Sequence, residues 1–265
     1  MCSSDLEAGY AGIGLHLAGY RRLRREGWGI DELAAVLDHH DQLLVEIEFL
    51  QAWSGGAADA AAAAEEERLA LELAAGLGAR HLQLGATFRD LPGAEQPEFD
   101  LDRAAESFAG LCDRAAAFGL RCSIEYLPEM TAVGSAAEAA AVVLAAGRPN
   151  GGICVDSWHH ERGPDTLADL AALGGAVVAS VQLDDGGPRV PGSDYRTDTS
   201  TNRLVPGEGL FDLVGLLQTL WAMGVTAPLG LEVISPSLAA SGDEATVAGR
   251  VAGGMRQVLA AAGSI

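Results

Sequence analysis

Short apolar runs alternate along the chain with longer segments whose apolar residues recur at helical spacing. The short runs predict buried strands, because each is apolar and bounded by polar or turn-forming residues. They lie at 12–17, 44–50, 81–84, 122–127, 153–156, 177–183 and 229–234. The longer segments predict helices at 30–40, 57–77, 101–118, 136–146, 166–173, 211–223 and 243–262.

The alternation of strands and helices predicts parallel strands joined by right-handed crossovers. Seven such strands fit a (β/α)8 TIM barrel that has lost its first strand through truncation at the N-terminus. The alternative α/β fold is an open doubly wound sheet, but no GxGxxG or Walker pattern follows a predicted strand. Residues 1–6 (MCSSDL) match a sequencing adapter translated in frame, so we expect an artefact there and a single barrel domain at 7–265.

Composition and charge narrow the class of protein. The chain has 265 residues, of which 49% are apolar, which suffices for one large folded domain. A formal charge of −20 argues against nucleic acid and anionic membranes as partners. No apolar run is long enough to span a membrane and no signal peptide is visible, so we expect a cytoplasmic protein. The four cysteines form no CxxC pair and are expected to be free thiols.

Four predicted strands end in a side chain that can ligate a divalent metal. They supply Glu125 in SIEYLP, Asp156 in ICVDSWH, Gln182 in SVQLDD and Glu232 in GLEVIS. The carboxyl ends of parallel strands meet on one face of a barrel, so we expect the four to surround one ion. This oxygen-rich set favours Mn²⁺ or Mg²⁺, with Co²⁺ and Zn²⁺ as alternatives.

Such a site predicts proton abstraction beside a carbonyl group. A divalent ion can polarise the carbonyl and stabilise an enediolate. Two carboxylates on opposite sides of a substrate can then move protons on and off the neighbouring carbon.

Further residues are candidates for contact with the substrate. His159, three residues after Asp156, is expected to bond the substrate or the groups around the metal. Trp53 is a candidate sugar-stacking wall, although a tryptophan at a strand end is as often a packing residue. Glu48 is expected to line the pocket, and Arg203 to bind a substrate hydroxyl or carboxylate or to pair with nearby acids.

A long segment, 185–206, is inserted between the strands of Gln182 and Glu232. It is rich in Gly, Pro, Ser, Thr and Asp and contains Arg203. Because loops on this face of a barrel carry function, the segment is predicted to be a lid.

The chain from residue 7 to its end resembles the sugar phosphate isomerase/epimerase family, whose barrel is xylose isomerase-like. The resemblance rests on SIEYLP, the Asp156-Ser-Trp-His159 run, VQLDD, the PGEGLFD run at 206–212 and LEVISP. It implies a divalent metal on Glu125, Asp156, Gln182 and Glu232. It also implies acid/base roles for Glu125 and Glu232 and a substrate contact for His159.

One departure from the family keeps a second reaction open. Many of the epimerases have His where this chain has Gln182, and a Gln followed by PGEG is more similar to bacterial 3-dehydroshikimate dehydratases. The predicted function is therefore an isomerase or epimerase of a small, unphosphorylated sugar-like or polyol-derived carbonyl compound, with a metal-dependent dehydratase as the alternative. A non-catalytic sugar-binding barrel is the third hypothesis, and association into a homo-oligomer stays open.

Overall fold

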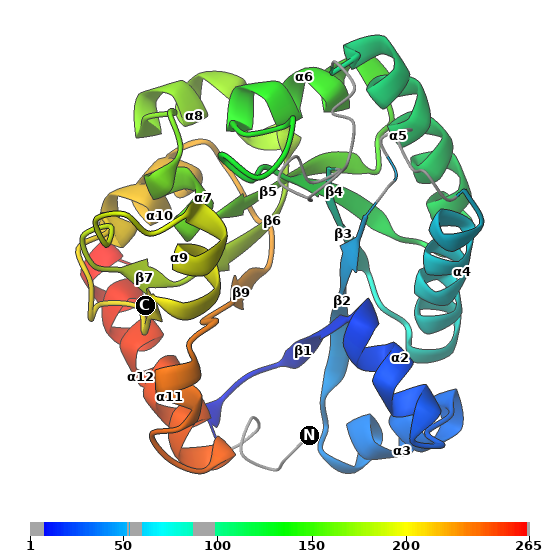
Figure 1. Ribbon diagram of the computed structural model, residues 1–265, viewed down its shortest axis with the longest axis horizontal. Helices are drawn as coiled ribbons and strands as arrows, with labels where there is room; N and C mark the ends of the chain where they lie inside the picture. Colours follow the sequence, from blue (N-terminus) through cyan, green and yellow to red (C-terminus); the bar gives the residue numbers. More distant parts are fainter. Residues whose placement is uncertain (1–7, 52, 54–59, 87–98, 264–265) are drawn as a thin grey trace.

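Seven parallel strands curl into a nearly closed barrel in the computed structural model, which describes residues 8–51, 53, 60–86 and 99–263 (Figure 1). The strand order is β1-β2-β3-β4-β5-β6-β9, so β1 and β9 form the two edges of the sheet in the described part of the chain. The bounds are β1 Gly12–His16, β2 Leu43–Leu50, β3 His81–Gly85, β4 Arg121–Glu125, β5 Gly151–Asp156, β6 Val178–Leu183 and β9 Leu229–Leu231. The predicted TIM barrel is confirmed.

Helices cover the outside of the barrel (Figure 1). Those that the sequence predicts are α3 Ile30–His39, α4 Ala60–Leu77, α5 Leu101–Ala116, α6 Ala136–Ala146, α8 Leu167–Leu173, α10 Leu213–Ala222 and α12 Glu244–Ala262. The structure adds α2 Leu17–Arg25, α7 Ser157–Arg162, α9 Tyr195–Thr201, α11 Pro236–Ala239 and a 3₁₀ turn at Gly175–Val177. In the described residues, no helix is both long and apolar enough to cross a membrane.

The main core fills the layer between the strands and the outer helices. Ile47, Leu82 and Ile124 of the strands are fully buried there, together with Leu73 and Phe108 of α4 and α5. This burial of apolar surface is the dominant favourable term in folding. Three predicted free thiols are buried and unpaired, namely Cys112, Cys122 and Cys154. Cys2 and the adapter-like residues 1–6 lie outside the described residues.

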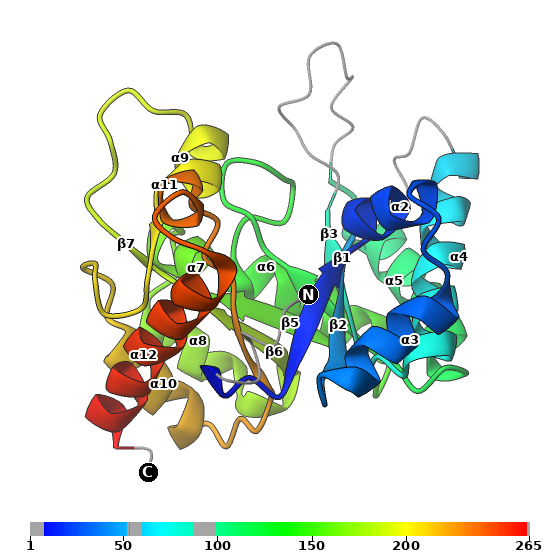
Figure 2. The ribbon, with the colours of Figure 1, turned by 90° about the horizontal axis from the view of Figure 1, so that it is seen from below.

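The inserted segment 185–206 is folded rather than irregular. It forms β7 Asp185–Gly186, helix α9 and β8 Arg203–Leu204, and β7 pairs with β8 in an antiparallel ladder. Figure 2 shows α9 and α11 above the end of the barrel toward which β1 points. An ion pair between Arg189 and Glu129, with N–O at 2.6 Å, joins the segment to the loop after β4. A lid function of the segment stays a prediction.

Candidate active site

The pleat of the strands brings the candidate site residues into the barrel. Side chains alternate between the two faces of a strand, so every second residue of a barrel strand points inward. Ile124 and Val155 pack outward in the core, which turns Glu125 and Asp156 inward at the ends of β4 and β5. Both carboxyl groups are buried. Alternation along each strand therefore selects these two acids before any tertiary contact is considered.

Three of the inward groups form a compact set that could hold a metal ion. One ligand atom each from Glu125, Asp156 and His159 lies within 4.8 Å of the others, and all three residues are buried. His159 is placed by the first turn of α7, where its backbone N–H donates to Asp156 Oδ1 at 3.1 Å. Its Nδ1 lies 2.7 Å from the hydroxyl of Tyr195, which leaves Nε2 facing Glu125 Oε1 at 3.5 Å.

Arg203 joins the remaining carboxylates to this set. Its Nη1 donates to Asp156 Oδ2 at 2.8 Å and to Glu232 Oε2 at 2.9 Å. The same nitrogen donates to Asp184 Oδ2 at 2.5 Å. The guanidinium is buried and thus pairs with acids, as one of the two sequence interpretations predicts. A substrate contact by Arg203 stays a prediction.

Burial and charge set the protonation of the site. Burial raises the pKa of Glu125 well above its usual range, and the charges of Glu232 and Asp156 add to the rise. Burial also raises the pKa of Glu232 to about 8, against the opposing effect of Arg203. Burial would raise the pKa of Asp156 too, but the charge and hydrogen bond of Arg203, together with the interactions of His159, hold that pKa below its usual range. Burial lowers the pKa of His159 to about 4, so its imidazole is neutral at pH 7.

The residues present fit a divalent cation. Asp156, Asp184 and Glu232 share a single guanidinium. Glu125 lies beside His159, with 3.5 Å between Oε1 and Nε2, and ionising so many buried carboxyls around one cation is costly. Glu125 Oε1 is fully buried without a hydrogen-bond partner among the described residues. An orphaned carboxylate oxygen beside a neutral imidazole is a donor set that divalent metals accept.

Gln182 is placed inside the barrel with its amide engaged by other residues. Its Nε2 donates to Gln83 Oε1 at 3.0 Å, and Gln83 Nε2 donates back to Gln182 Oε1 at 2.9 Å. Its Nε2 also donates to Glu46 Oε1 at 3.1 Å. The ligand role of Gln182 therefore stays a prediction, and it requires the amide to exchange these partners for the ion.

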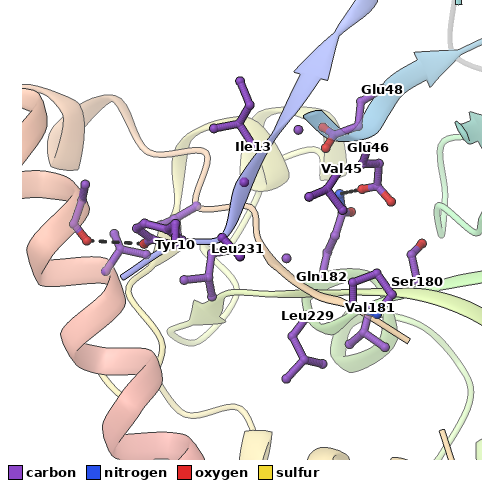
Figure 3. A pocket seen from close by; sticks show the side chains of 18 of the residues that line it. Tyr10, Ile13, Val45, Glu46, Glu48, Ser180, Val181, Gln182, Leu229 and Leu231 are labelled. Carbon is purple, nitrogen blue, oxygen red and sulfur yellow. Dashed lines mark hydrogen bonds between the residues drawn. The ribbon is translucent and has the colours of Figure 1, made fainter. Parts of the chain in front are cut away.

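Glu48 lines a cavity at the edge of the sheet, and its predicted contact with a substrate stays a prediction. The cavity holds about 580 Å³ and lies between β1 and β9, against β2, β6 and α12. Figure 3 shows Glu46, Glu48 and Gln182 on one side of it and Leu229 and Leu231 on another. Gly14 of β1 leaves the space for this carboxyl, because a Cβ there would come within 2.3 Å of Glu48 Oε1.

Glu48→Gln is expected to stabilise the protein increasingly as the pH rises. Burial and the neighbouring Glu46 raise the pKa of Glu48 to about 8 from an ordinary 4.5. An acid whose pKa is raised by folding costs no stability below its ordinary pKa of 4.5. As the pH rises from there toward 8, the free energy of unfolding falls, and glutamine removes that loss. We expect a gain of roughly 2 kcal/mol, or about 4–8 °C, at pH 8.5 and little at pH 5. Melting curves at both pH values test this, with the exposed Glu106→Gln as control; an equal shift at both pH values contradicts it.

Trp53 lies in the hydrophobic core instead of in the cluster of acids. Its ring packs edge-on against Phe108 of α5, with ring centroids 5.6 Å apart, and only 8% of the residue is exposed. Of the two interpretations from the sequence, the packing one describes this placement.

Two residues of the site have no role in the sequence-based prediction. Asp184 follows β6 directly, and the acidic pair in VQLDD is a signal that could have identified it. Tyr195 orients His159 from α9, 36 residues further along the chain, and no local pattern marks it.

The family model described as xylose isomerase-like TIM barrel matches residues 6–257. The chain belongs to this family. Its membership confirms the family resemblance that SIEYLP, the Asp156-Ser-Trp-His159 run and LEVISP indicate.

Two curated relatives are named for different reactions. The chain is 31% identical over 137 residues to a 3-dehydroshikimate dehydratase of Pseudomonas aeruginosa, a match that covers 52% of this chain and 21% of that protein. It is 28% identical over 135 residues to an inosose isomerase of Bacillus licheniformis, covering 50% of this chain and 47% of that protein. The matches thus span less than half the length of either relative.

Solved structures of the family share the fold. The IOLI protein, crystallised with a bound zinc atom, superimposes with a TM-score of 0.81 at 18% identity, covering 97% of this chain and 91% of that one. An L-ribulose 3-epimerase superimposes with a TM-score of 0.72 at 17% identity, covering 98% and 88%. At these identities the likeness concerns the barrel.

Proposed function

We propose that the protein is a divalent-metal-dependent isomerase or epimerase of a small, unphosphorylated sugar-like or polyol-derived carbonyl compound. The observation that carries the proposal is the buried set of Glu125, Asp156 and His159, with Glu232 linked to it through Arg203. An inosose isomerase among the relatives supports a substrate of this class.

Glu125, Asp156 and Glu232 would hold the ion, with His159 and the predicted Gln182 as the neutral donors. Mn²⁺ suits such a mixture of oxygen and nitrogen best, and Mg²⁺, Co²⁺ and Zn²⁺ are the alternatives. When bound, the ion polarises the substrate carbonyl and makes the neighbouring C–H more acidic.

Glu125 and Glu232 would serve as the acid/base pair. A carboxyl whose pKa is raised toward neutrality can both accept and return a proton at working pH. One of them takes the proton from the carbon beside the carbonyl, and the other delivers a proton to the opposite face or to the oxygen. Tyr195 engages Nδ1 of neutral His159, so its Nε2 would bind either the ion or a substrate hydroxyl.

A metal-dependent dehydratase is the second candidate. It is favoured by Gln182 and by the identity of 31% to a 3-dehydroshikimate dehydratase. The reaction begins with the same proton removal, but the neighbouring hydroxyl then leaves as water.

Proton NMR in D₂O tests both candidates. The protein would be incubated with Mg²⁺, or with trace Mn²⁺, and with each member of a panel of ketoses, inososes and 3-dehydroshikimate. Deuterium incorporation beside the carbonyl with an isomeric product is the expected result, and EDTA should abolish it until metal is restored. A new alkene or aromatic signal would instead establish the dehydratase. A protein that binds no metal and exchanges no proton across the panel would overturn both.

A further inference from the structure

The partners of Arg203 fall into two groups. One group consists of predicted metal ligands and their neighbour. The carboxylates of Asp156 and Glu232 accept from Nη1, the backbone carbonyl of Glu232 accepts from it at 3.1 Å, and His159 Nε2 lies 3.3 Å from Nη2. The other group has no predicted role in holding an ion. Thr199 accepts from Nε through its carbonyl and from Nη2 through its hydroxyl, each at 3.1 Å, and Asp184 Oδ2 accepts from Nη1 at 2.5 Å.

Asp184 is itself held firmly in place. The hydroxyl of Ser157 donates to Asp184 Oδ1 at 2.8 Å, and the backbone N–H of Asp184 donates to the same hydroxyl at 2.8 Å. Both residues are completely buried. The carboxylate with the shortest contact to Arg203 is therefore anchored by its own hydrogen bond to Ser157.

Arg203 and a divalent ion would share the carboxyl groups of Asp156 and Glu232 at this site. The ion would be held by carboxyl groups that now accept hydrogen bonds from Nη1, so its charge would lie near the guanidinium. Like charges at such a distance repel strongly in a poorly solvated site. An ion that takes the oxygens now bound to Nη1, Asp156 Oδ2 and Glu232 Oε2, would displace Arg203 from them. The guanidinium would then need another anion to stay buried.

We propose that Arg203 is the built-in counter-ion of the metal-free site, and that Asp184 is the positioning residue that retains Arg203 when a divalent cation takes Asp156 and Glu232. This inference rests on the proposed function. Asp184 favours ion binding because its carboxylate keeps Arg203 paired after Asp156 and Glu232 bind the ion. Arg203 opposes ion binding because it pairs with those two ligands in the metal-free site.

Titration of Mn²⁺ in the absence of substrate tests the inference, by calorimetry and by the electron paramagnetic resonance of free Mn²⁺. Asp184→Asn is expected to weaken Mn²⁺ binding at least tenfold, since Arg203 then stays on the metal ligands. Arg203→Met is expected to tighten binding at least tenfold. In the double variant, Asp184→Asn should weaken binding less than threefold relative to Arg203→Met alone, because no guanidinium remains to be held.

Controls separate the transfer of Arg203 from the metal ligands to Asp184 from a simple effect of charge on Mn²⁺ binding. Asp198→Asn removes another buried acid, which pairs with Arg162, and should leave Mn²⁺ affinity within twofold. Ser157→Ala loosens Asp184 without changing any charge and should weaken binding in the same direction as Asp184→Asn. It stands in for Asp184→Asn if that variant does not fold, and Arg203→Gln likewise stands in for Arg203→Met.

The outcomes distinguish the two proposals. If the parent protein binds no Mn²⁺, the proposed function fails. If the parent binds Mn²⁺ but Asp184→Asn and Ser157→Ala bind it equally well, the exchange is overturned while the function stands. An equal loss from Asp184→Asn with and without Arg203 would also overturn it, because Asp184 would then act on the ion by its charge alone.

Discussion

Glu232→Gln is expected to lower turnover by about 10³-fold or more while the fold stays intact. Removal of a positioned acid/base group alone costs about 10²–10⁴-fold, and weaker ion binding adds to the loss. Glutamine keeps the shape of the side chain and one oxygen, so packing around β9 changes little. Because burial raises the pKa of Glu232 to about 8, the parent carboxyl can exchange protons near neutral pH, which an amide cannot do.

The measurement is deuterium incorporation from D₂O into whichever panel substrate the parent protein turns over. Circular dichroism and a melting curve show that the variant is folded, and Mn²⁺ titration shows how much of the loss is weaker ion binding. Glu106→Gln, on the exposed face of α5, is the matched control and should retain full activity. Full activity of Glu232→Gln at saturating metal would contradict the acid/base assignment.

Arg203→Met is expected to destabilise the metal-free protein by about 3–5 kcal/mol at pH 8, because breaking a buried ion pair leaves its partners uncompensated. Three carboxyls lose their shared cation, namely Asp156, Asp184 and Glu232. The guanidinium holds the pKa of Asp156 below its usual range, which stabilises the fold above that range. Without Arg203 the pKa of Asp156 would rise, and its burial would become a cost that increases with pH.

Urea denaturation with EDTA at pH 5.5 and pH 8 measures this effect. The loss should be smaller at pH 5.5, where buried carboxyls can take up protons. Arg148→Met removes an exposed ion pair with Asp113 and should cost at most about 1 kcal/mol at either pH. A loss of the same size at both pH values would mean that Arg203 contributes packing rather than charge. Excess Mn²⁺ should restore much of the stability, since the ion binds the folded state.

Much of the barrel and three of its candidate site acids follow from the sequence. Alternation of apolar strands and helices predicts the seven parallel strands β1 to β6 and β9, and the ends of three of them predict Glu125, Asp156 and Glu232. Both predictions rest on short-range rules: the pleat fixes which face a side chain takes, and parallel pairing brings the carboxyl ends of strands to one side.

The tertiary structure decided which charged and polar groups pair with one another. Arg203 lies 47 residues from Asp156 in the chain, and Gln182 lies 99 residues from Gln83, so no local pattern relates them. Trp53 joins the core for the same reason, since its partner Phe108 comes from another unit of the barrel. Sequence patterns determine which elements form and which way their side chains point. Which buried donors and acids become partners depends on long-range packing, because the cost of burying each polar group is offset only by the neighbours that the closed barrel supplies.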